Sequence, residues 1–259
     1  MGPQTNARAT RPAESGARRK ATAKQLALRL PSWGGKRAGA GRKAKGDRPQ
    51  VSHRPRGKVR PDVPMHVTLR VRKELWPVRS ERRFRAITRA LQGGSDRLGL
   101  RVVHYSVQDN HLHLIVQAND ARALGRGMQG LSIRLAKALN AVSGRRGKVF
   151  VDRFHSHALR TPREVRHALA YVLNNARKHA AQSGDRYPRD WIDPFSSGLW
   201  FDGWSPGPRR ERALALAQRH VDELGGDAGV AWAPRPRGWL LTVGWRRRGL
   251  INLDEVPSA

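Results

Sequence analysis

Two pairs of side chains in this sequence could do chemistry together. His111 and His113 stand one residue apart after the turn-forming Asp109-Asn110, and Tyr171 precedes Asn175 by four positions. Two imidazoles and an amide oxygen can hold a divalent cation, and a phenol is a candidate nucleophile. A phenol with a pKa of about 10 is roughly 0.1% ionised at pH 7, so a cation near the attacked group would assist it.

The histidines fall in a predicted β-hairpin. Two runs rich in β-forming residues, 101–108 and 111–117, flank the turn. Side chains alternate along a strand, so His111 and His113 should share one side of it. The opposite layer should then receive Leu112, Leu114 and Val116.

A helix is predicted from Pro162 to Ala180. Thr161 is its expected N-cap, and Glu164 three residues later completes a capping box. On one helix, Tyr171 and Asn175 share a face about 6 Å apart along the axis. A cation held by the histidine pair and the Asn175 amide would lie within reach of a phosphodiester that faces the phenol.

The remaining pattern predicts a strand at 65–71, a helix at 80–98, a helix at 121–142 and an interrupted strand at 149–160. With the hairpin, these elements have the order βαββαβ, which is the ferredoxin-like pattern. The second helix has the clearest apolar stripe. That stripe comprises Leu124, Met128, Leu131, Leu135, Leu139 and Val142.

The segment from about Pro64 to Ala180 resembles the single-tyrosine HUH transposase family, and most of all its branch of REP-associated tyrosine transposases. The resemblance covers under half of the chain and depends on four local matches in the family's order. They are His66-Val-Thr-Leu-Arg70, Asn110-His-Leu-His-Leu-Ile-Val116, Gly147-Lys-Val-Phe-Val-Asp-Arg-Phe-His155 and Tyr171-Val-Leu-Asn-Asn175.

This resemblance implies an α+β fold, a ferredoxin-like HUH domain with an added C-terminal tyrosine helix. It implies that Tyr171 attacks single-stranded or hairpin DNA and forms a 5′-phosphotyrosine, while His111, His113 and Asn175 hold Mg²⁺ or Mn²⁺. Two imidazoles also suit zinc, so the preference for magnesium comes from the resemblance alone. Family members act as monomers or homodimers, and both states stay open.

The sequence departs from the family pattern at two places. Gln108-Asp109 stands where the family has Met-Pro, and Ala176 stands where it has proline. Neither change removes a proposed ligand or the nucleophile. They keep open a domesticated, catalytically inactive DNA-binding protein of the same fold.

A second His-x-His pair serves as an internal control. His155 and His157 have the spacing of the first pair but no preceding turn led by asparagine. We therefore expect them to be strand residues rather than metal ligands. Arg153 and His155 are instead candidate DNA contacts.

Composition favours a nucleic-acid partner. Fifty-one Lys and Arg against 20 Asp and Glu give a net charge of +31, far more than solubility requires. Arginine outnumbers lysine 41 to 10, which suits phosphate and guanine contacts but would equally follow from a GC-rich genome. A basic RNA-binding protein is a further alternative, although the aromatic strand pattern expected of one is missing.

Three parts of the chain are predicted: a basic, disordered tail at 1–62, the HUH-like domain at 63–180 and a Trp- and Arg-rich extension at 181–259. The tail has 17 Lys and Arg against three acids. Within it, Arg37, Arg42 and Lys43 lie in a Gly-rich run that could follow a DNA groove. The extension contains six of the eight tryptophans and a helix predicted from about Pro208 to Leu224.

The sequence contains no cysteine, which excludes disulfides and zinc sites with cysteine ligands. Its apolar runs are shorter than the about 18 residues of a membrane span, and its first residues lack the apolar centre of a signal peptide. Together with the family resemblance, these absences predict a cytoplasmic, bacterial nucleoid-associated location without a membrane partner.

Overall fold

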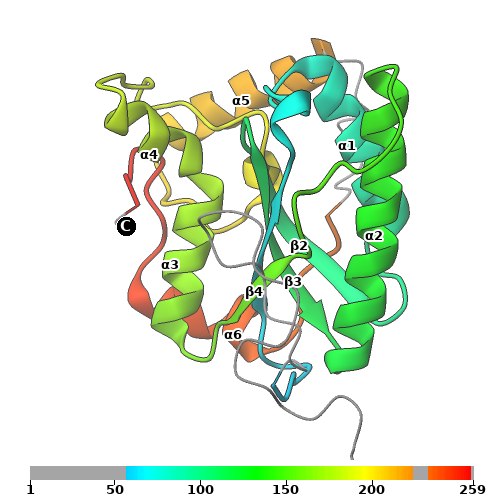
Figure 1. Cartoon of the computed structure of the whole chain (residues 1–259). Coiled ribbons are helices and arrows are strands. Elements are labelled where there is room, and N and C mark those ends of the chain that lie inside the picture. The colour runs from blue at the N-terminus through cyan, green and yellow to red at the C-terminus, as the bar shows by residue number, and fades with distance from the viewer. Residues whose placement is uncertain (1–56, 224–232, 258–259) are drawn as a thin grey trace, which may run out of the picture. The chain divides into compact units, whose positions relative to one another are not determined.

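The computed structural model describes residues 57–223 and 233–257. Its sheet consists of β1 (Met65–Arg70), β2 (Leu100–Val107), β3 (His111–Ala118) and β4 (His155–Ala158). The strands lie in the order β2-β3-β1-β4, and each neighbouring pair is antiparallel (Figure 1). Thr68 on β1 lies opposite His113 on one side and His155 on the other. Directly paired residues share a face, so both His-x-His pairs lie on the same side of the sheet.

Two helices, α1 (Glu81–Gly94) and α2 (Ala121–Val142), cover the other face of the sheet (Figure 1). The helix α2 has the bounds that the sequence predicts. Its start is fixed because the Asp120 side chain accepts a hydrogen bond of 2.7 Å from the backbone N–H of Ala123. Most of the predicted stripe is buried in the core, namely Leu124, Met128, Leu131, Leu135 and Leu139.

The face of the sheet that carries the histidines is covered by α3 (Pro162–Leu173) and by the C-terminal part of the chain. Val103 and Ile115 of the sheet join an apolar cluster with α3, Phe201 and Trp245. The other elements of this part are α4 (Asn175–Gln182), α5 (Pro208–Glu223), α6 (Trp239–Thr242) and two 3-10 turns, Ser197–Trp200 and Gly244–Arg248. A further 3-10 turn, Lys73–Leu75, follows β1.

The prediction of one continuous helix from Pro162 to Ala180 was wrong, because the chain forms two helices, α3 and α4, with a break at Asn174. The start of α3 is as predicted, with both halves of the capping box formed. At the break, the side-chain amide of Asn174 donates to the carbonyls of Asn252, at 3.1 Å, and Glu255, at 3.0 Å. These contacts hold Asn174 at φ −107° and ψ 18°, outside helical geometry. The partners lie about 80 residues away, so local pattern does not reveal them.

Two other predicted elements are shorter than expected. The helix predicted to reach residue 98 ends at Gly94, because Ser95 has extended backbone angles and Asp96 and Leu98 have positive φ. The strand predicted at 149–160 is limited to β4, and Phe150 forms only an isolated bridge with Val71. The predicted mixture of helices and a sheet is confirmed. Within the described residues, no helix is long and apolar enough to cross a membrane.

Candidate metal and nucleophile site

The predicted arrangement of the β3 histidines is confirmed. Leu112, Leu114 and Val116 join the core beneath α1 and α2, and the histidines project to the other side. The rings of His111 and His113 are 4.4 Å apart between centroids, and their Nε2 atoms are 2.7 Å apart. Two ring nitrogens of one strand therefore converge on a single point.

The second nitrogen of each ring meets another polar atom. Nδ1 of His111 donates to the side-chain oxygen of Asn110, in the hairpin turn. Nδ1 of His113 lies 3.3 Å from the Thr68 hydroxyl and 3.0 Å from Nε2 of His66. When both Nδ1 atoms carry their protons, the two Nε2 lone pairs face each other and repel. A cation shared between them relieves that repulsion, and such Nδ1 partners are the usual support of metal-binding histidines.

Burial keeps these imidazoles in the neutral form that binds metals. Burial lowers the pKa of His111 and of His66 from 6.5 to about 4. Burial, followed by the nearby His111, lowers the pKa of His113 to about 2. All three rings are therefore uncharged at neutral pH, and each has one ring nitrogen with a lone pair available to a cation.

Tyr171 of α3 lies beside this pair. Its ring is 5.1 Å from the His113 ring and 5.8 Å from the His66 ring, edge-on in both cases. The ammonium of Lys178, on α4, is 4.8 Å from the centre of the tyrosine ring. The ring is half-buried and lines an open groove of about 450 Å³, together with His66, His157 and Arg163.

The other two tyrosines lie elsewhere. Tyr105 is 1% exposed in the core between the sheet and α1. Tyr187 stacks on Trp191 with 3.8 Å between ring centres. Of the three phenols, Tyr171 is the one that the structure brings to the histidine pair.

Asn175, the third predicted ligand, begins α4 and is fully buried. Neither its amide oxygen nor its amide nitrogen has a hydrogen-bond partner among the described residues. An unpaired buried amide costs about 1–3 kcal/mol, and coordination of a cation would satisfy its oxygen. Across the described part of the chain, no group of three His, Asp or Glu side chains is arranged to hold a metal. The role of Asn175 as a third ligand therefore stays a prediction.

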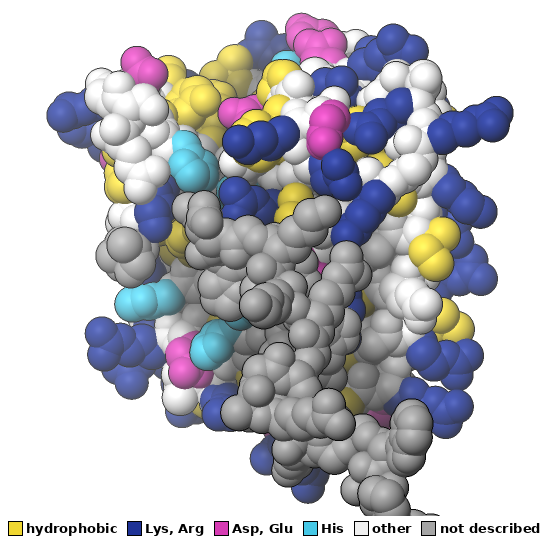
Figure 2. Space-filling view, viewed as in Figure 1, with side chains coloured by type: hydrophobic (Ala, Val, Ile, Leu, Met, Phe, Trp, Pro, Cys, Tyr) yellow, Lys and Arg dark blue, Asp and Glu magenta, His cyan; other side chains and the backbone are white. Residues whose placement is uncertain are grey.

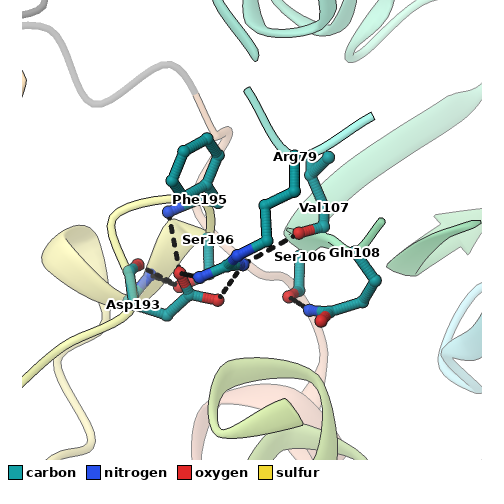
Figure 3. A network of polar contacts seen from close by, with 8 residues as sticks. Arg79, Ser106, Val107, Gln108, Asp193, Phe195 and Ser196 are labelled. Atoms are coloured by element: carbon teal, nitrogen blue, oxygen red, sulfur yellow. Dashed lines mark hydrogen bonds and ion pairs between the residues drawn. The ribbon is translucent and has the colours of Figure 1, made fainter. Parts of the chain in front are cut away.

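The hairpin that carries the pair is anchored from outside the sheet. Arg79 forms a two-pronged ion pair with Asp193, at 2.9 and 2.6 Å, and also donates to the carbonyl of Val107 at the end of β2 (Figure 3). The Asp193 side chain is fully buried. The backbone N–H of Val78 donates to the carbonyl of Asp109 in the turn. The turn before His111 is thus fixed by contacts with two distant segments.

The predicted DNA contacts divide into two groups. Arg37, Arg42 and Lys43 lie outside the described residues. Arg153 and His155 are exposed, and His155 lies on the same face as the histidine pair. Lys and Arg side chains dominate the described part of the surface in Figure 2, with few acidic side chains between them.

Four residues near the pair were missed by sequence reasoning. His66 and Thr68 alternate on β1, but only the register shows that they reach His113. Lys178 and His179 follow the break in the helix, and the His179 ring is 6.2 Å from the His111 ring. The polar alternation of His66 and Thr68 was a usable signal, because it marks a strand face that is not wholly apolar.

No protein-family model and no curated protein matches this chain. Among solved structures, the chain is similar to one described as a REP-associated tyrosine transposase bound to a REP hairpin. The two chains are 18% identical, and the similarity covers 57% of this chain and 82% of the other with a TM-score of 0.43.

Proposed function

We propose that this chain is a DNA strand transferase that cuts single-stranded or hairpin DNA with Tyr171 as its nucleophile. The observation that carries the proposal is the pair of facing Nε2 atoms of His111 and His113, 2.7 Å apart, beside the Tyr171 ring. Neutral imidazoles whose Nδ1 atoms have hydrogen-bond partners suit a cation at their Nε2 atoms. A half-buried phenol next to them, open to a groove, suits attack on a phosphodiester.

In the proposed reaction, the Tyr171 oxygen attacks the phosphorus of a phosphodiester. The new bond between this oxygen and phosphorus forms as the bond to the 3′ oxygen breaks. The phenol gives up its proton, and the departing 3′ oxygen takes up one, which leaves a 5′-phosphotyrosine and a free 3′ hydroxyl. Attack by a 3′ hydroxyl on the phosphotyrosine reverses these steps and rejoins the strand.

Each side chain of the site has a task in this scheme. The Lys178 ammonium, 4.8 Å from the centre of the tyrosine ring, would place a positive charge beside the attacked phosphate. Mg²⁺ or Mn²⁺ held by His111, His113 and Asn175 would polarise the phosphate and stabilise the departing oxygen. The Asn110 and Thr68 side chains keep the two Nδ1 atoms engaged, so that both Nε2 lone pairs stay directed at the ion.

The architecture and the surface support the same proposal. The element order and the strand order β2-β3-β1-β4 are those expected of a ferredoxin-like domain, to which we assign residues 63–180. The net charge of +31 favours binding to the DNA backbone. The site is proposed to work in a monomer or in a homodimer.

A covalent-capture experiment tests this function. The full chain is incubated with labelled, hairpin-containing single-stranded DNA and Mn²⁺, denatured, digested and analysed for the labelled peptide. We expect label on the peptide with Tyr171, none with Tyr171→Phe, and undiminished label with the control Tyr187→Phe. Label that persists in Tyr171→Phe would refute the nucleophile. Tight binding without any adduct on several palindromic substrates would instead support a DNA-binding protein that does not cut.

A further inference from the structure

Among the described residues of the C-terminal layer, one tryptophan, Trp239, is exposed. Trp204 and Trp245 are 2% and 1% exposed, and each donates its indole N–H to a backbone carbonyl, so both anchor the layer. Trp239, at the start of α6, is 48% exposed. Val243, one turn later, is 49% exposed. Adjacent exposed apolar side chains of this size indicate a contact surface.

The Trp239 ring is held in place although it is exposed. A Cβ atom at Gly244 would lie 2.7 Å from the ring, so the indole packs directly on the backbone there. The guanidinium of Arg247 lies 5.2 Å from the ring centre. The segment before α6 is fixed by Gln117 of β3, which accepts from the backbone N–H of Arg237 and donates to its carbonyl. A fixed ring loses little freedom when it binds a flat partner.

The ring forms part of a basic groove. Trp239 and Leu240 line one side of a groove of about 350 Å³, and Lys58, Arg60 and Arg160 line another. Arg60 is paired with Asp62 at 2.6 Å. Lys58, Arg160 and the neighbouring Arg247 have no ion pair among the residues that the structure describes. The groove therefore combines one aromatic face with uncompensated positive charge.

This groove is distinct from the candidate site. It is also lined by Met65 and Ala158, which pair with each other at the start of β1. The histidine pair lies opposite Thr68 and Arg70, three to five residues further along β1, or about 10–17 Å at 3.4 Å per residue. In Figure 1, α6 lies at the lower end of the sheet and α4 at the upper end.

We infer that this groove binds unpaired nucleotides of a single-stranded nucleic acid. Trp239 stacks on one base, and Lys58, Arg160 and Arg247 contact the phosphates on either side of it. Stacking on an aromatic ring beside a basic track is the usual way in which proteins hold single strands without reading their sequence. Duplex DNA keeps its bases stacked inside and leaves the ring unused. The inference does not require cleavage at Tyr171.

The test measures binding by the full chain, in EDTA so that no cleavage intervenes. Labelled single-stranded DNA, single-stranded RNA and duplex DNA are titrated by fluorescence anisotropy. We expect Trp239→Ala to weaken single-strand binding about tenfold, while Trp239→Phe stays close to wild type. Duplex binding should stay unchanged. The matched control Leu216→Ala, an exposed apolar residue on α5, should leave single-strand binding unchanged.

Two further variants separate stacking from charge. Gly244→Ala should weaken single-strand binding with Trp239 still present, because the added methyl displaces the ring. Arg247→Ala should reduce the slope of log affinity against log salt by about 0.7, the value for one single-strand phosphate. The control is Arg219→Ala, on the exposed side of α5, which should leave the slope unchanged. Unaltered single-strand binding by Trp239→Ala, or an equal loss for duplex DNA, would overturn the inference.

Discussion

The two His-x-His pairs lie on the same face of one sheet, yet only the pair on β3 has the structure of a site. β3 is an inner strand, so His113 has neighbours on both sides, Ser106 on β2 and Thr68 on β1. β4 is an edge strand, and both His155 and His157 are exposed. Equal spacing therefore does not give equal chemistry. The inner strand adds the burial and the polar partners that direct lone pairs to one point.

The largest effect, on formation of the DNA adduct, should come from replacing the histidines of one pair or the other with alanine. His111→Ala or His113→Ala should lower metal-dependent formation of the DNA adduct by more than about 100-fold, since each removes a proposed ligand. The matched variants His155→Ala and His157→Ala should change it by only a few fold. DNA affinity should be largely retained in all four, because the basic surface binds independently. Equal losses of adduct formation in variants of the two pairs would contradict the assignment of the β3 pair, rather than the β4 pair, as metal ligands.

A smaller effect is expected from Asn175, which separates metal binding from stability. Asn175→Leu should lower the affinity for Mn²⁺ by about 10- to 100-fold. It should leave the free energy of unfolding of the metal-free protein unchanged or raise it, because the variant removes an unpaired buried amide. Isothermal titration and urea unfolding measure the two quantities.

The neighbouring Asn174 provides the control for that variant. Asn174→Leu should lower stability by about 1–3 kcal/mol, because it leaves the carbonyls of Asn252 and Glu255 without their donor. If Asn175→Leu destabilised the metal-free protein as much, the unpaired amide would be a structural residue rather than a ligand.

The polar partners of the inner pair should matter less than the ligands. Asn110→Ala removes the acceptor at Nδ1 of His111, and we expect about tenfold weaker Mn²⁺ binding. Thr68→Val should cost less than Asn110→Ala, since His66 also reaches Nδ1 of His113. Titration calorimetry at pH 7.5 would measure both. Full affinity in Asn110→Ala would show that the turn does not orient the ring.

The smallest effect, on the pH dependence of stability, should come from His104, a buried histidine on the face of the sheet that carries both His-x-His pairs. Burial lowers the pKa of His104 from 6.5 to about 4, and its Nδ1 lies 3.3 Å from the Ser197 hydroxyl. Between about pH 4 and 6.5, His104 therefore binds a proton in the unfolded chain but stays neutral in the folded protein. Its contribution to stability is complete above about pH 6.5 and is lost as the pH falls toward 4, by at most about 1.4 kcal/mol per pH unit.

Urea unfolding between pH 8 and 4 checks this titration. His104→Gln keeps a hydrogen-bonding side chain but does not titrate, so its stability should fall less steeply below pH 6.5. The buried His66, His111 and His113 should preserve part of the slope in this variant. An identical slope in wild type and variant would show that His104 does not contribute.

Sequence pattern was sufficient where local periodicity and capping determine the structure. The hairpin around Asn110, the helix α2 and the capping box at Thr161 were all predicted in place. Their signals lie within about 20 residues, because strand alternation, helical stripes and caps act over short range.

What the pattern missed depends on contacts between distant segments. The break at Asn174 is set by carbonyls near residue 255, and the hairpin anchor joins Arg79 to Asp193 across 114 residues. His66 became part of the site only through the register of β1 on β3. Tyr171 could be named from the sequence because it shares a predicted helix face with Asn175. The role of each proposed ligand stays a prediction.

The most direct test of the β3 site is the number of Mn²⁺ ions bound per chain, measured by titration with electron paramagnetic resonance detection. We predict one ion in the wild type, one in the double variant His155→Ala/His157→Ala, and none in His111→Ala/His113→Ala. Circular dichroism would verify that both variants fold. An unchanged ion in His111→Ala/His113→Ala, or no ion in the folded wild-type protein, would contradict the assignment of this pair as a cation site.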